Sequence, residues 1–166
     1  YRNESGKKFV DATPKVLAER PMKVSRGAAW VDIDNDGYLD LYVAGYEIWQ
    51  KAVYADALFR NVGGKDFVAH ALPKARNMSA RGVSAADFDS DGDVDVYVSN
   101  YRLFPNRLWR NDGGGKFTEI ATPSGTAGDG GLGAWGHTIG SAWGDLDNDG
   151  YLDLFVGNFS HPPAYQ

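Results

Sequence analysis

The clearest pattern in this chain is a short alternation of apolar and polar residues that occurs three times. It overlaps and follows the acidic stretches "DIDNDGYLD" at 32–40, "DFDSDGDVD" at 87–95 and "DLDNDGYLD" at 145–153. Because successive side chains of a strand point to opposite faces, each alternation predicts a β-strand with its apolar residues on one face and Asp, Tyr or Phe on the other. The apolar positions are Leu39, Leu41, Val43; Val94, Val96, Val98; and Leu152, Leu154, Val156.

Helical periodicity is not found over any comparable length of the sequence. Only "PKVLAERPM", residues 14–22, predicts a helical turn, and we expect Pro21 to end it because proline cannot continue a helix.

A second sequence marker recurs in step with the acidic stretches. "YRNESGKKFVDATP" at 1–14, "FRNVGGKDFVAHALP" at 59–73 and "WRNDGGGKFTEIATP" at 109–123 share an aromatic residue, Arg-Asn, a glycine-bearing turn, a Phe and a closing Pro. Together the two markers predict units of four short strands, with the acidic stretch joining the first two and the glycine turn joining the last two. In the second full unit the four strands are "GVSAADF", "VDVYVSN", "NRLWRN" and "KFTEIA".

Four-stranded units of roughly 40 to 60 residues have the size of β-propeller blades. We therefore predict an all-β fold, a β-propeller segment of four-stranded antiparallel blades that forms a single unit over residues 1–166. It holds the end of one blade (1–23), two full blades (24–75 and 80–123) and the first half of another (138–166). These make about three blade equivalents, and propellers close with about four to eight. We expect the rest of the ring to come from the same longer chain or from other copies.

Composition narrows the possible functions. The chain is 43% hydrophobic and 13% aromatic, enough to fill a core. No window approaches the ~18 uninterrupted apolar residues of a membrane helix, so we expect no membrane span. Lys and Arg are scattered, which argues against nucleic-acid binding. The sequence has no Cys, which excludes disulfides and thiolate metal sites and leaves the compartment open.

The acidic stretch has the ligand pattern of a Ca²⁺ site. In the first copy Asp32, Asp34 and Asp36 occupy positions 1, 3 and 5, the backbone carbonyl of Tyr38 is available at position 7, and Asp40 occupies position 9. A glycine at position 6 permits a sharp turn. Hard oxygen ligands in this number favour Ca²⁺, which takes about six to eight of them in a flexible geometry.

The other two copies repeat these positions. The predicted ligands are Asp87, Asp89, Asp91, the carbonyl of Asp93, and Asp95 in the second loop. They are Asp145, Asp147, Asp149, the carbonyl of Tyr151, and Asp153 in the third. An EF-hand requires a Glu at position 12 and flanking helices, but Val43, Val98 and Val156 stand there and strands are predicted on both sides. An Asp-rich turn without metal is the alternative. The acidic stretch occurs three times with every carboxylate retained, and this repetition favours three Ca²⁺ sites of structural rather than catalytic role.

The phrases "AAWVDIDNDGYLDLYVAG", "SAADFDSDGDVDVYVSN" and "SAWGDLDNDGYLDLFVGN" resemble FG-GAP/VCBS repeats, the calcium-loop blades of integrin α-subunit propellers. With "NRLWRNDGGGKFTEIA", the chain resembles most the proteins related to cartilage acidic protein. The resemblance implies an extracytoplasmic propeller (secreted, periplasmic or at the cell surface), commonly of about seven blades. It implies Ca²⁺ at the first inter-strand turn of each blade, and it leaves the bound ligand open.

From these patterns we predict a non-enzymatic, calcium-binding scaffold for protein or carbohydrate binding, or adhesion, outside the cytoplasm. The alternatives are a supporting or catalytic domain of an exported polysaccharide-active enzyme, and an accessory subunit of a larger surface or membrane assembly. Trp30 and Trp143 occupy equivalent positions, for which packing between blades is the expected role. Candidate ligand-binding residues lie in the Gly-rich loop 124–137 and in the connections 47–56 and 101–106: Trp135, His137, Trp49, Tyr54, Tyr101, Arg102 and Phe104.

Overall fold

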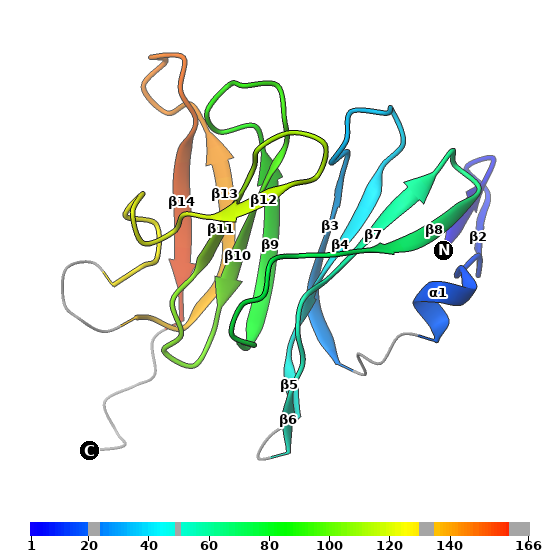
Figure 1. The fold of residues 1–166 in the computed structure, drawn as a ribbon, viewed down its shortest axis with the longest axis horizontal. Coiled ribbons are helices and arrows are strands. Elements are labelled where there is room, and N and C mark those ends of the chain that lie inside the picture. Colours follow the sequence, from blue (N-terminus) through cyan, green and yellow to red (C-terminus); the bar gives the residue numbers. More distant parts are fainter. Residues whose placement is uncertain (20–23, 49–50, 130–134, 160–166) are drawn as a thin grey trace.

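The computed structural model describes residues 1–19, 24–48, 51–129 and 135–159. The described chain is nearly all β, with antiparallel sheets standing side by side (Figure 1). The all-β prediction with four-stranded antiparallel sheets is therefore confirmed. Within the described residues, no helix has the length and apolar character needed to cross a membrane.

The first four-stranded sheet is a simple antiparallel meander in which each strand pairs with the next one along the chain, apart from a small inserted hairpin. Its strands are β3 (Ser25–Val31), β4 (Asp40–Gly45), β7 (Ala57–Val62) and β8 (Asp66–His70). The inserted hairpin consists of β5 (Glu47–Ile48) and β6 (Ala52–Val53). The sequence pattern did not predict this hairpin because each of its strands is only two residues long.

The second four-stranded sheet repeats this order without an insertion. Its strands are β9 (Ala80–Ala86), β10 (Asp95–Asn100), β11 (Arg107–Asn111) and β12 (Phe117–Glu119). They correspond to the four strand segments expected in this unit.

Two hairpins and one short helix complete the described structure. Near the C-terminus β13 (Thr138–Gly144) pairs with β14 (Asp153–Asn158), and at the N-terminus β1 (Arg2–Glu4) pairs with β2 (Lys8–Val10). The helix α1 (Lys15–Ala18) is the expected helical turn. Pro21, which we expected to end it, lies outside the described residues.

The sheets pack face to face, and both faces of the central strands are buried. Tyr42 of β4 and Val96 of β10 meet in the core between the two four-stranded sheets. Tyr97, the next residue of β10, points to the opposite face and packs with Trp143 of β13. Val43 of β4 faces away from the second sheet and packs towards α1. The alternation thus separates two apolar faces, so the Tyr positions are as fully buried as the Val positions.

The first strands of the three repeats approach one another closely at equivalent glycines. A Cβ atom on Gly27 of β3 would lie 2.9 Å from the carbonyl oxygen of Arg81 on β9. A Cβ atom on Gly82 of β9 would lie 2.8 Å from the carbonyl oxygen of Ile139 on β13. At Gly140, the equivalent position of β13, an added Cβ would have no neighbour within 4 Å. The absence of a side chain at Gly27 and Gly82 therefore lets successive strands pack backbone to backbone.

Candidate metal centres

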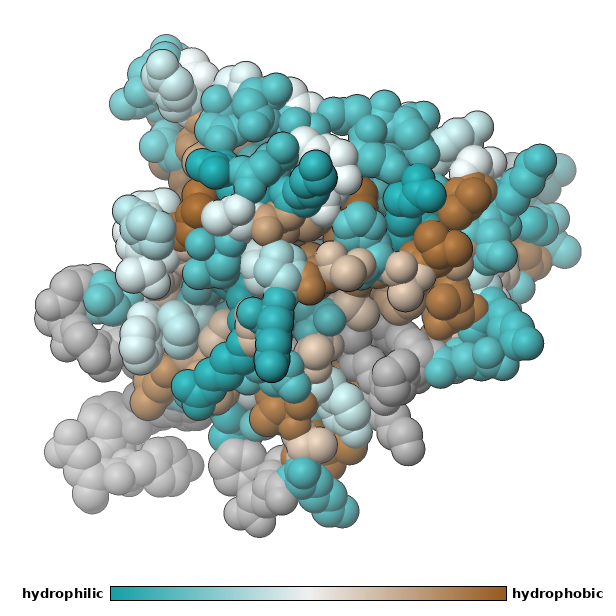
Figure 2. All heavy atoms as spheres, in the orientation of Figure 1, coloured by the Kyte–Doolittle hydropathy of each residue, from teal (hydrophilic) through white to brown (hydrophobic). Residues whose placement is uncertain are grey.

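The three acidic loops lie at the same end of their sheets, because each joins the first strand of a repeat to the second (Figure 1). They connect β3 to β4, β9 to β10 and β13 to β14. In Figure 2 hydrophilic side chains gather over this end of the molecule. Strand direction alone thus places every predicted metal loop on one side.

Each loop is bent by two residues with left-handed backbone at positions 4 and 6. The φ angles are 56° at Asn35 and 86° at Gly37 in the first loop. The second and third loops repeat them, with 60° at Ser90, 93° at Gly92, 60° at Asn148 and 92° at Gly150. Gly adopts this region without steric cost, and Asn adopts it more readily than most residues. The two turns bring the carboxylates at odd-numbered positions to one side of the loop.

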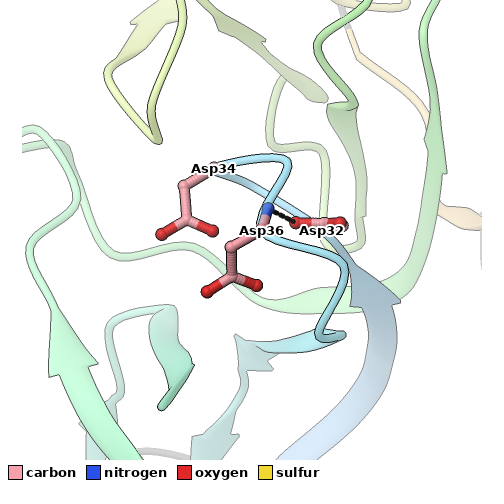
Figure 3. A group of neighbouring side chains, drawn as sticks. All are labelled: Asp32, Asp34 and Asp36. Atoms are coloured by element: carbon pink, nitrogen blue, oxygen red, sulfur yellow. Dashed lines mark hydrogen bonds between the residues drawn. The ribbon is translucent and has the colours of Figure 1, made fainter. Parts of the chain in front are cut away.

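The carboxylates converge in all three loops. Figure 3 shows Asp32, Asp34 and Asp36 around a common space, with the backbone N–H of Asp36 donating to Asp32. In each loop three carboxylate oxygens lie within 4.8 Å of one another. The three sets are Asp32, Asp34, Asp36; Asp87, Asp89, Asp95; and Asp145, Asp147, Asp153. Between them these sets use positions 1, 3, 5 and 9, which are the side-chain ligand positions expected from the sequence.

Backbone N–H groups hold the carboxylates at positions 1 and 5 in the same way in every copy. Asp32 accepts hydrogen bonds from the N–H groups of Asp36 at 3.2 Å and Gly37 at 2.9 Å. Asp36 accepts one from the N–H of Tyr38 at 2.9 Å. The remaining loops repeat these contacts at Asp87, Asp91, Asp93, Asp145, Asp149 and Tyr151. The carbonyls of Tyr38, Asp93 and Tyr151 stay predicted ligands.

The ninth-position Asp also joins the loop to the third strand of its sheet. One oxygen of Asp40, which is fully buried, accepts from the N–H of Ile33 at 2.8 Å, and the other accepts from Asn61 at 2.6 Å. Asp95 repeats this arrangement with Phe88 at 3.1 Å and Asn111 at 2.8 Å.

The Asn of the recurrent Arg-Asn marker is therefore part of the loop's support. Asn61 Nδ2 donates to the carbonyl of Leu39 at 3.0 Å, and its Oδ1 accepts from the N–H of Gly64. Sequence reasoning identified the marker only as a repeat signal and missed this role. Its recurrence after each of the first two acidic stretches was the signal that could have revealed it.

Burial and like charge raise the pKa values of these carboxyl groups. Burial is the main cause of the raised pKa of Asp40, with the neighbouring Asp34 and Asp32 adding to it. Burial likewise raises the pKa of Asp95 to about 6, against the opposing effect of its two backbone N–H donors. The pKa of Asp89 is raised by burial first and then by Asp91 and Asp87. A divalent cation among these groups would favour their ionised forms.

Among the described residues, one buried loop oxygen is left without a protein partner. Asp34 Oδ1 is buried and has no hydrogen-bond partner among the described residues, while its Oδ2 accepts from Arg60 Nη1 at 3.0 Å. A buried acceptor without a donor is costly. The oxygen-only donor set, its convergence and this orphaned oxygen all fit Ca²⁺, a hard cation that takes carboxylate and carbonyl ligands.

The other candidate residues lie away from the loops. The His137 ring is 4.5 Å from the ring of Tyr101, which is mostly buried, and Arg102 forms an ion pair with Glu47. Trp135 is exposed, Tyr54 packs beside the first sheet, and Phe104 lies under Arg76 at 4.8 Å. Trp49 lies outside the described residues. Trp143 packs against the second sheet as expected, whereas Trp30 is 57% exposed and contacts Phe67 of its own sheet.

Fold and loops together define an all-β protein built from acidic-loop repeats, and residues 99–156 match the family model described as FG-GAP-like repeat. An FG-GAP-like repeat is thus identified in this chain, as the sequence predicted. The chain is similar to cartilage acidic protein 1 of Mus musculus, at 27% identity over 172 residues, and of Xenopus tropicalis, at 26% over 171. Both alignments cover 95% of this chain and 24% of the relative. The chain therefore spans about a quarter of the length of these curated relatives.

Proposed function

We propose that this chain is a calcium-binding, non-enzymatic segment of a β-propeller that acts as a rigid scaffold for binding protein or carbohydrate outside the cytoplasm. The observation that carries the proposal is the convergence of carboxylates in three loops of the same backbone conformation. Convergent carboxylates repel one another unless a cation lies between them. One Ca²⁺ in each loop would turn this repulsion into a link between the first two strands of every repeat.

The ligand set suits an environment rich in calcium. Carboxylates at positions 1, 3, 5 and 9 and a carbonyl at position 7 provide oxygen ligands for each ion. Extracellular modules with such sites bind Ca²⁺ with Kd values of about 10⁻⁴ to 10⁻³ M, and extracellular Ca²⁺ keeps them occupied. The relatives are named for cartilage, a tissue rich in extracellular matrix, and this name supports the same location.

The propeller proposal is supported by the way the sheets stack. Successive sheets bury opposite faces of the same strands, and each first strand lies against the next at a glycine. Tyr42 and Tyr97 are fully buried by the following sheet, whereas Phe155, their equivalent in β14, is 69% exposed. Trp30, on the opposite outermost face of the stack, is also exposed. Further blades on both sides would cover these two residues.

Calorimetric titration of Ca²⁺ into metal-free protein tests the proposal. We expect three ions per chain for the wild type and two for Asp87→Asn, which removes one first-position ligand. Asp66→Asn is the matched control, because Asp66 is exposed and lies on β8 outside the loops. An unchanged stoichiometry in Asp87→Asn, or no binding by the wild type, would contradict the calcium sites.

A further inference from the structure

The first strand of each repeat carries a β-bulge at the same position. The pairing of β3 with β4 skips Arg26, that of β9 with β10 skips Arg81, and that of β13 with β14 skips Ile139. In each case the next residue is the glycine at the equivalent position of the first strand, Gly27, Gly82 or Gly140. A bulge leaves its extra residue out of the ladder and re-aims the side chain, and bulges are over-represented next to functional sites.

These three bulge residues line one pocket. With Tyr101 and Phe159 they enclose about 380 Å³. The pocket lies at the end of the sheets opposite the acidic loops, because the bulges stand near the start of strands whose last residues lead into those loops. Its volume lies within the range of small-molecule sites, about 300 to 1,000 Å³.

The two arginines of the pocket both contact the ring of Tyr46. The Cζ atom of Arg26 is 5.2 Å from the ring centroid of Tyr46, and that of Arg81 is 5.3 Å from the same ring. Arg81 also lies 4.1 Å from the ring centroid of Tyr101, and its Nη2 donates to the Tyr46 hydroxyl at 2.9 Å. Aromatic rings therefore contact both of the guanidinium groups that line this pocket.

No carboxylate balances this pair of charges among the described residues. Arg60, Arg102 and Arg107 each form an ion pair, whereas Arg26 and Arg81 form none within the described ranges. Moreover, Arg81 Nε is buried and has no hydrogen-bond partner there. Two guanidinium groups that line one pocket and keep unused donors have the charge and the donors to hold an anion.

We propose that this pocket binds a small organic carboxylate, with the carboxylate held by Arg26 and Arg81 and the ligand body against the aromatic and aliphatic wall. Guanidinium groups pair with carboxylate, phosphate and sulfate. The apolar wall of the pocket consists of Tyr101, Phe159 and Ile139. An inorganic anion would leave this wall without contact, whereas the ring of an acidic sugar would pack against it. The inference rests on the proposed binding role of the scaffold and gives that role a ligand class.

Binding of glucuronate to the Ca²⁺-saturated protein, measured by calorimetry, tests this site. Glucose is the neutral control with the same ring, and sulfate tests the anion without a ring. We expect glucuronate to bind at least tenfold more tightly than either, and Arg81→Met and Arg26→Met each to weaken it by tenfold or more. Arg2→Met is the matched control, because Arg2 lies on the exposed β1 hairpin and should leave binding unchanged.

Other outcomes would overturn the inference. Equal binding of glucuronate and glucose would exclude an anion site, and equal binding of sulfate and glucuronate would show a site for inorganic anions. Circular dichroism spectra identical to that of the wild type would show that the two Met variants fold. Unchanged affinity of folded Met variants for glucuronate would also refute the proposed site. The two proposals are tested by different titrations. Failure of the loops is read from the Ca²⁺ titration, and failure of the pocket is read from the glucuronate titration. Repeating the glucuronate titration in EGTA measures the pocket without the metal.

Discussion

Replacing Asp56 by Asn is expected to destabilise the fold strongly, because Asp56 is the centre of a buried polar network between the two four-stranded sheets. Asp56 pairs with Arg107 Nη1 at 2.9 Å, and both side chains are only 7% exposed. The carboxylate also accepts from the Tyr42 hydroxyl at 2.7 Å and from the N–H of Gly45 at 2.8 Å. Trp109 Nε1 donates to the Tyr42 hydroxyl at 2.9 Å, which extends the network into the second sheet.

Asp56→Asn keeps the size of the side chain but leaves the Arg107 charge buried without its counter-ion. Removing one partner of a buried pair costs about 3–5 kcal/mol. That is a large share of the ~5–15 kcal/mol by which domains are stable. For a chain of this size we expect Tm to fall by roughly 6–20 °C.

Urea and thermal unfolding followed by circular dichroism in Ca²⁺ measure this loss. Glu4→Gln is the matched control, because Glu4 forms an ion pair with Arg2 at 2.8 Å whose side chains are 39% and 69% exposed. Such a surface pair contributes about 0–1 kcal/mol. A loss of under about 1 kcal/mol in Asp56→Asn, no larger than in the control, would refute the reasoning about this network.

Two further substitutions probe the repeat itself. Asp95→Asn is expected to lower the free energy of unfolding by about 1–3 kcal/mol even in EGTA. Two backbone N–H groups donate to the oxygens of Asp95, and in the variant one of them would face the side-chain NH₂ group instead. Asp91→Asn should destabilise the protein only in Ca²⁺, since an Asn side chain can still accept the hydrogen bond from the N–H of Asp93. Equal losses for the two variants in EGTA would contradict the role of Asp95 as both metal ligand and hydrogen-bond acceptor. Gly82→Ala is expected to cost about 1–3 kcal/mol in urea unfolding, because its Cβ would meet the Ile139 carbonyl. Gly140→Ala, which meets nothing within 4 Å, should cost less, and an equal loss in the two would contradict close packing of the first strands.

The strands were predictable because their determinants are local. Period-two alternation, Arg-Asn markers and glycine turns recur in the same order in the repeats, and β9 to β12 follow them segment by segment. The hairpin of β5 and β6 escaped prediction because two-residue strands show no alternation. Complete burial of Tyr42 and Tyr97 could not be read locally, since it depends on which sheet packs on the far face.

The metal loops were predictable in residue positions but not in their support. Alternating Asp around a glycine specifies which carboxylates converge. The bonds from Asn61 and Asn111 to the ninth-position Asp join segments that are distant along the chain. The placement of Arg26 and Arg81 in one pocket depends on bulges and on contact between β3 and β9, for which a single sequence has no local signal.

Counting bound metal by native mass spectrometry, with thermal melts in Ca²⁺ and in EGTA, tests the central claim most directly. Three Ca²⁺ ions per chain, together with a clear fall in Tm on chelation, is the predicted result, because metal removal leaves the carboxylates of every loop without a counter-ion. A chain that carries no Ca²⁺ and melts at the same temperature in both buffers would contradict the account.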